Sequence, residues 1–125
     1  VAGKAVKEVA YHLDHAQHWV VRLGDGTDES HRRMQAALDA EWPFVEELFE
    51  SVDATLVADG VAVDPTGLRP AVLRRVEAVL AEATLVVPEV ARAVGGGRQG
   101  LHTEHLGYLL AEMQHLSRSH PEATW

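Results

Sequence analysis

Apolar side chains recur at helical spacing through the first 23 residues, and this pattern constrains the fold more than any other feature of the sequence. Successive residues of an α-helix are about 100° apart around its axis. At that angle one stripe contains Val6, Val9, Leu13, Ala16, Val20 and Leu23. Polar residues fill most of the remaining positions, so residues 2–23 are predicted to form an amphipathic helix that buries one face.

The same periodicity predicts further helices, separated by turn residues. Thr27 is a good N-cap after the Gly-Asp-Gly turn, and Pro43 is expected to kink or restart the helix that follows. The expected helices span residues 28–42, 44–50, 52–59, 68–86 and 102–119. Strand propensity is confined to residues 84–87, which have no alternating segment to pair with. The sequence therefore predicts an all-α fold in a single domain, residues 1–125.

Composition excludes several classes of function. The 125 residues contain no cysteine, which removes Cys-ligated zinc, iron–sulfur clusters and thiol catalysis and fits a reducing compartment. The net charge of -8 lacks the basic footprint of a nucleic-acid-binding protein. The first 21 residues are too polar for a signal peptide or a membrane span. We therefore expect a cytoplasmic protein whose partners are neither nucleic acids nor membranes.

Histidines and carboxylates on the first two helices indicate either a metal site or a polar network. Carboxylate-bridged di-iron bundles take a lone Glu from one helix and Glu-x-x-His from the next. Glu8 and His12 share one ridge of the first helix, and Asp28-x-x-His31 opens the second, with His31 in its apolar arc. The residues alone favour a buried, metal-free network of these four side chains, because inward ligands from two further helices are missing.

A glycine-rich loop and two aromatic side chains are weaker candidates. The loop GGGRQG, residues 95–100, precedes the last helix and could hold a CoA phosphate through backbone N–H groups, helped by Arg98, Gly100 and His102. The loop matches neither a P-loop nor a dinucleotide fingerprint, so a flexible connector is the alternative. Tyr11 and Trp125 lie outside the apolar stripes and are candidate anchors of a contact between protein chains.

Several long stretches resemble the PaaC family, the structural subunits of phenylacetyl-CoA epoxidase. They include RLGDGT-x-x-SHRRMQ, GVAVDP, GLHTEHLGYLLAEMQ and the terminal PEATW. The similarity covers nearly the whole chain and corresponds to the C-terminal half of the family.

The resemblance implies a ferritin-like helical bundle that is a non-catalytic subunit of a bacterial multicomponent monooxygenase. That complex epoxidises the ring of phenylacetyl-CoA in aerobic phenylacetate catabolism. It implies a homologous catalytic partner that carries the di-iron centre and receives electrons from a flavin and iron–sulfur reductase. Glu8, and Asp28 with His31, map onto the former ligand positions of the third and fourth bundle helices, with Asp28 in place of the usual Glu. The chain itself is then expected to hold no catalytic residue, metal or cofactor.

Half of a bundle leaves apolar helix faces uncovered, and such faces drive association. The chain begins without a methionine and within a helical pattern. We therefore expect either a fragment of a longer protein or two copies that rebuild a four-helix core around a twofold axis. The alternative function is a homodimeric ferritin-like di-metal protein with its own redox or metal-handling activity, because a twofold axis doubles every ligand. A helical interaction module without any site is the third possibility.

Overall fold

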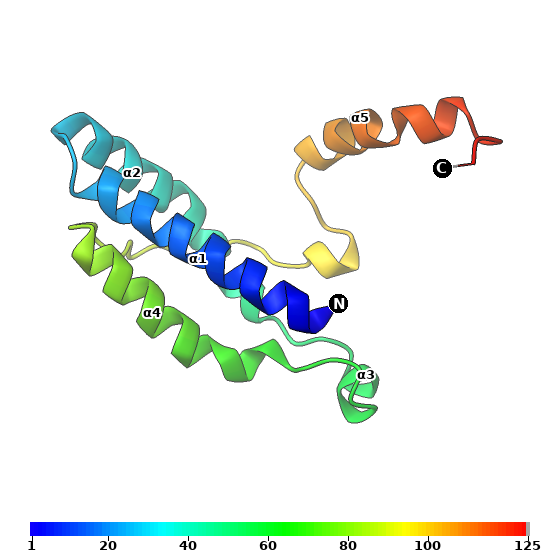
Figure 1. The fold of residues 1–125 in the computed structure, drawn as a ribbon, viewed down its shortest axis with the longest axis horizontal. Helices are drawn as coiled ribbons and strands as arrows, with labels where there is room; N and C mark the ends of the chain where they lie inside the picture. Colours follow the sequence, from blue (N-terminus) through cyan, green and yellow to red (C-terminus); the bar gives the residue numbers. More distant parts are fainter. Residues whose placement is uncertain (125) are drawn as a thin grey trace. The chain divides into compact units, whose positions relative to one another are not determined.

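The computed structural model describes residues 1–124, and every regular element among them is a helix (Figure 1). The elements are α1 (Ala2–Gly24), α2 (Asp28–Glu41), the 3-10 helix η1 (Trp42–Phe49), α3 (Ala54–Ala58), the 3-10 helix η2 (Pro65–Leu68), α4 (Arg69–Glu82), the 3-10 helix η3 (Gly97–Gln99) and α5 (His105–Ser119). The predicted all-α fold is confirmed. None of the helices in this part of the chain is long and apolar enough to cross a membrane.

The chain divides into two compact units, Val1–Ala93 and Val94–Trp125. The first contains α1 to α4 with η1 and η2, and the second contains η3 and α5. The expected single domain stays a prediction.

In the first unit, α1 and α2 form a helical hairpin whose turn is closed by a capping box. The Thr27 hydroxyl accepts the backbone N–H of Ser30 at 3.2 Å, and the Ser30 hydroxyl accepts that of Thr27 at 3.0 Å. Two N–H groups that the helix start leaves unpaired are thereby satisfied, and Asp28 and Glu29 add favourable charge in the first turn. The predicted N-cap is confirmed.

α1 contacts α2 along one side and α4 along another (Figure 1). The core is small and lies where the C-terminal ends of α1 and α4 meet α2. Leu80, Ala83 and Leu85 are buried there. They are surrounded by partly buried side chains of α1, α2, η1, α4 and the segment after α4, which are Val20, Val21, Met34, Leu38, Trp42, Val76 and Val87.

The two largest differences from the predicted helices lie in the first unit. Residues 43–49 belong to a 3-10 helix instead of a regular α-helix, since Pro43 supplies no N–H for an α-helical bond at the start of the segment. α4 ends at Glu82 and not at residue 86. Thr84 adopts a left-handed φ of 60°, its N–H donates to the Ala81 carbonyl at 3.1 Å, and the Leu85 N–H donates to the Leu80 carbonyl at 2.9 Å. This is a Schellman termination, in which the turning residue is usually glycine.

The segment after α4 is extended and is held on α2 by one side-chain amide. Gln35 donates to the Val86 carbonyl and accepts the Val86 N–H, both at 2.9 Å. The amide satisfies both backbone groups of Val86, as a neighbouring strand would do. Of residues 84–87, which have strand propensity, Thr84 turns the chain and Val86 pairs with the Gln35 side chain in place of a neighbouring strand.

In the second unit, α5 carries an apolar stripe that no other α-helix among the described residues of that unit covers. It begins at His105, three residues later than predicted. Leu106 is half-buried, whereas Leu109, Leu110, Met113 and Leu116 are exposed. As far as residue 124, this unit therefore presents an amphipathic helix face without a helical partner of its own.

Candidate functional site

His31 caps the C-terminal end of α1. The imidazole Nδ1 lies 2.7 Å from the carbonyl oxygen of Gly24, the last residue of α1, and the side chain is half-buried. The last carbonyls of a helix have no partner within it, so an imidazole N–H is a suitable donor. The Thr84 hydroxyl donates to the same carbonyl at 3.4 Å. His31 faces inward as predicted, and its hydrogen-bond partner is a backbone carbonyl oxygen.

Gly24 also lies in close contact with Ala83, the residue that follows α4. A Cβ at this position would lie 2.6 Å from the Ala83 carbonyl oxygen and 2.8 Å from the Ala83 Cβ. Gly24 and Ala83 are both buried. Only glycine fits here without a shift of the backbone.

The structure does not bring the four candidate ligands together. Glu8 and His12 form a pair at 3.8 Å on α1, with side chains 67% and 65% exposed, and Asp28 is exposed as well. Glu8 precedes the His31 contact at Gly24 by more than four turns of α1, roughly 24 Å along its axis. The expected buried network of four residues is therefore wrong for Glu8, His12 and Asp28, because α1 carries the first two away from the turn at which α2 begins.

Among residues 1–124, no three His, Asp or Glu side chains lie close enough together to hold a metal ion. The assignment of Glu8, His12, Asp28 and His31 as vestigial ligand positions stays a prediction. His31 Nδ1 is engaged by a carbonyl, so a metal at this imidazole would use Nε2.

The outward face of α1 carries a ladder of aromatic and imidazole rings. Tyr11 stacks on His15 with 6.0 Å between ring centroids, and the His15 ring meets Trp19 edge-on at 6.3 Å. The Arg22 guanidinium lies 5.5 Å from the Trp19 ring centroid. Tyr11 is exposed as predicted, and exposed Tyr, Trp and Arg are typical of protein interfaces. Trp125, the other predicted anchor, lies outside the described residues.

The glycine-rich loop uses its own backbone N–H groups. Those of Gln99 and Leu101 donate to the Gly96 carbonyl at 2.9 and 3.0 Å, and that of Gly100 donates to Gly97 at 3.2 Å. Gly96 and Gly100 have φ angles of 108° and 87°, a region that favours glycine. These three amides are not available to a phosphate, so a CoA phosphate here would depend on Arg98, His102 and the remaining backbone. That site stays a prediction.

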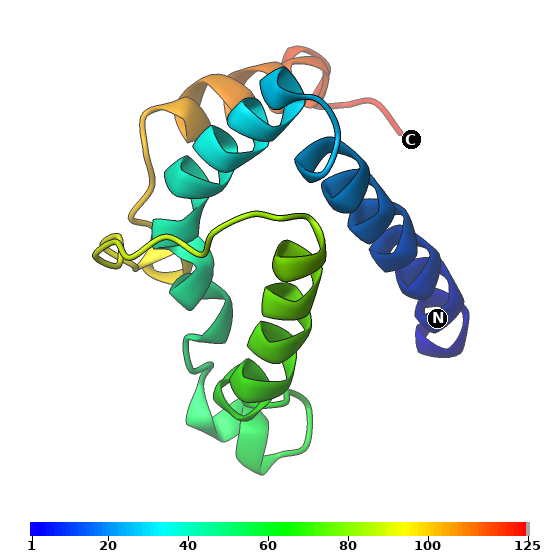
Figure 2. The ribbon, with the colours of Figure 1, turned by 90° about the vertical axis from the view of Figure 1, so that its left-hand side faces the viewer.

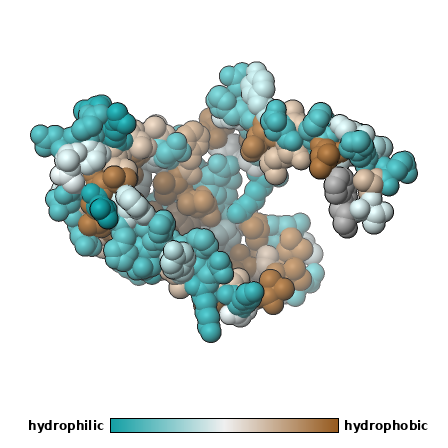
Figure 3. Space-filling model, turned by 45° about the horizontal axis from the view of Figure 1, so that its top comes forward, coloured by the Kyte–Doolittle hydropathy of each residue, from teal (hydrophilic) through white to brown (hydrophobic). Residues whose placement is uncertain are grey.

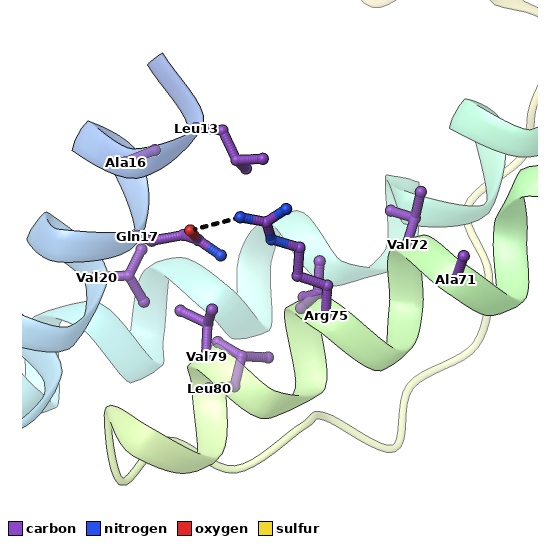
Figure 4. A pocket seen from close by; sticks show the side chains of 10 residues that line it. Leu13, Ala16, Gln17, Val20, Ala71, Val72, Arg75, Val79 and Leu80 are labelled. Carbon is purple, nitrogen blue, oxygen red and sulfur yellow. Dashed lines mark hydrogen bonds between the residues drawn. The ribbon is translucent and has the colours of Figure 1, made fainter. Parts of the chain in front are cut away.

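An apolar groove lies between α1 and α4 in the first unit, and the sequence pattern revealed only one of its walls. It has a volume of about 450 Å³. Its walls are Leu13, Ala16, Gln17 and Val20 of α1, and Ala71, Val72, Arg75, Val76, Val79 and Leu80 of α4 (Figure 4). In Figure 2 the two helices are close at their C-terminal ends and diverge toward their N-terminal ends. Brown, hydrophobic side chains are visible between teal ones on this unit in Figure 3.

One polar pair crosses the groove. Arg75 donates from Nη2 to the Gln17 side-chain oxygen at 3.1 Å, so the single charged side chain of the lining is a cation (Figure 4). The periodicity of α1 indicated half of this groove, because Leu13, Ala16 and Val20 belong to its predicted stripe. The opposite wall depends on where α4 packs, which the sequence pattern does not show.

The first turn of α4 is tied to η1 by an ion pair. The Arg69 Nε lies 2.9 Å from a carboxylate oxygen of Glu46, and further contacts join the same two groups. The hydrogen bond from the Arg69 guanidinium lowers the pKa of Glu46 below its usual range, against a smaller opposite effect of burial. Arg92 pairs with Glu50 in the same way. The Arg69 pair thus anchors the N-terminal end of α4, which provides one wall of the groove, whereas the Arg92 pair joins the segment after α4 to the end of η1.

The structure defines an all-α protein whose helices leave apolar faces open, and the class of protein follows from the comparison with known sequences. The chain belongs to the family of phenylacetic acid catabolic proteins, which it matches over residues 1–125. It is 47% identical over 127 aligned residues to the C subunit of the 1,2-phenylacetyl-CoA epoxidase of Escherichia coli (strain K12). The alignment covers 100% of this chain and 51% of the relative, so the chain spans about half the length of the relative that it matches. The resemblance found in the sequence is confirmed.

Proposed function

We propose that this chain is part of the non-catalytic, structural subunit of a phenylacetyl-CoA epoxidase complex. In this complex a homologous partner subunit holds the di-iron centre at which the aromatic ring is epoxidised. The observation that carries the proposal is the 47% identity to the E. coli epoxidase subunit across the whole chain. The arrangement of the former ligand positions supports the non-catalytic part of it.

Two features of the structure fit a structural role. His31 and Thr84 connect α2 and the end of α4 to the end of α1, so the residue that resembles a metal ligand works as a helix cap. Apolar side chains of α1 and α4 also lie open in the groove, as expected for a subunit that packs against more polypeptide.

The test replaces the matched part of the E. coli relative with this chain and asks whether the chimera restores growth on phenylacetate to a strain without that relative. We expect growth, and we expect phenylacetyl-CoA-dependent oxygen consumption by the purified complex. The variants Glu8→Gln and Asp28→Asn should consume oxygen at the parent rate, because both side chains are exposed and, in this proposal, neither is a metal ligand.

Elemental analysis of the purified chain provides the second arm of the test. Iron, manganese and zinc well below one ion per chain are expected, with the di-iron centre recovered in the partner subunit. About two metal ions per dimer, lost in the His31→Gln variant, would contradict the proposal and favour the homodimeric di-metal protein.

A further inference from the structure

We propose that the groove between α1 and α4 is a docking site for one amphipathic helix, supplied by the part of a full-length subunit that this chain does not cover. This inference rests on the proposed function, since it assumes a subunit as long as the E. coli relative. It adds the site of contact and the chemistry of the segment that binds there.

The groove has the dimensions and the lining of a helix-packing site. The α4 wall from Ala71 to Leu80 rises about 14 Å, or between two and three helical turns. Leu13 and Val72 face each other's helix from opposite walls and are each 40% exposed. Beyond the groove, Val9 and Val6 extend the apolar stripe of α1 toward its N-terminal end and are still more exposed. A helix laid between the diverging N-terminal halves of α1 and α4 would cover all of these side chains.

The charges identify the chemistry of the occupant. Arg75 is the single ion in an apolar lining, and its bond to Gln17 is to a neutral amide. Covering the groove would remove water from this guanidinium, which is costly without an anionic partner. The docking helix is therefore one with an apolar face and a Glu or Asp placed opposite Arg75.

Two other occupants fit less well. A second copy placed groove to groove would bring the two Arg75 guanidinium groups together near the twofold axis, and each copy has a net charge of -8. An acyl-CoA would find one cation for its phosphates in this lining. The uncovered 49% of the E. coli relative is, in contrast, enough chain to supply several helices.

The absence of cysteine in this sequence allows a direct test with single thiols. Val72→Cys places a thiol in the groove wall, and the matched control Ala78→Cys places one on an exposed position of the same helix outside the lining. Leu13→Cys and Lys7→Cys form the corresponding pair on α1. Each variant is made in the chimera with the remaining part of the E. coli relative, in which any cysteine is replaced by serine, and its rate of alkylation is measured under native conditions.

In the chimera we expect the groove thiols to react about tenfold more slowly than their controls, because a covered thiol reacts only when the site opens. Equal rates at groove and control positions in a chimera that still supports growth would overturn the inference and leave the proposed function intact. A chimera whose groove thiols are protected but which fails to support growth would support the inference and contradict the proposed function.

The isolated chain separates the other occupants. Protection of Val72→Cys that increases with the concentration of the chain would assign the groove to a second copy. Protection by added phenylacetyl-CoA would assign it to a ligand. Either result would overturn the inference.

Discussion

Gly24 is the position at which one added methyl group should disturb the fold most. In Gly24→Ala the new Cβ would lie 2.6 Å from a backbone oxygen and 2.8 Å from the Cβ of Ala83, so α1 and α4 must move apart. Overpacking of this kind costs about 1–3 kcal/mol. Alanine returns at most about 1 kcal/mol through its higher helix propensity. We expect a net loss of about 1–2 kcal/mol in the free energy of unfolding.

Gly3→Ala is the matched control, because it makes the same substitution in the same helix where nothing lies within 4 Å of the added Cβ. Here the propensity effect acts alone, so this variant should gain a few tenths of a kcal/mol. Urea unfolding followed by circular dichroism measures the free energy of unfolding of both variants. The slope of that free energy against urea concentration should be the same for both variants and the parent. If Gly24→Ala is as stable as Gly3→Ala, the close approach of α1 and α4 at Gly24 is refuted.

Four further predictions concern single side chains. Thr84→Gly should be about 1 kcal/mol more stable than Thr84→Ala, because both variants lose the hydroxyl bond to the Gly24 carbonyl and only glycine adopts a left-handed φ without strain; equal melting temperatures of the two variants would refute the Schellman turn. Gln35→Ala should lower the free energy of unfolding by about 1–2 kcal/mol, mainly through loss of the two hydrogen bonds to Val86, since the third, to Asp39, is exposed; the Val86 amide should exchange faster with solvent, and an unchanged exchange rate would contradict the contact. The pKa of Glu46 is lowered in the folded chain, so the contribution of this carboxylate to the free energy of unfolding is present at neutral pH and is lost as the pH falls through the lowered pKa. Glu46→Gln should therefore weaken the dependence of stability on pH in the acid range. Identical acid titrations of variant and parent would speak against the pair with Arg69. His31→Gln should cost about 1 kcal/mol without changing the metal content, and loss of a bound metal would contradict its role as a cap.

The helices could be predicted because their signals are local. The stripe of α1, the Thr27 cap and the end of the short helix before Gly60, whose φ is 68°, each depend on residues within a few positions of one another. The end of α4 could not be predicted in this way. Helices that end in a left-handed residue usually place glycine there, and this chain has Thr84, so the periodicity alone extended the helix to residue 86.

Among the four candidate ligands, the orientation of His31 was predicted correctly and its partner was not. The helical wheel correctly placed His31 on the inner face of α2. Its partner is the Gly24 carbonyl, and a backbone acceptor leaves no trace in the residue pattern. The helical wheel placed Glu8 on a ridge beside the apolar stripe of the first helix and His31 in the apolar arc of the second, but most of the length of α1 separates the two residues. The axial rise of a helix predicts this separation, whereas a wheel projects all residues onto one plane and loses it.

A change of the angle between α1 and α4 at the Gly24–Ala83 contact would be amplified toward the N-terminal end of α1. α1 is 23 residues long, so its N-terminal end lies roughly 35 Å from this contact. A rotation of about 10° at the contact would displace that end by about 6 Å, a large part of the usual distance of about 8–10 Å between packed helices. The width of the groove at its open, N-terminal end thus depends on the packing at the Gly24–Ala83 contact. Substitutions at Gly24, His31 or Thr84 are therefore expected to change how tightly a segment is held near Val6 and Val9, although none of the three would touch it.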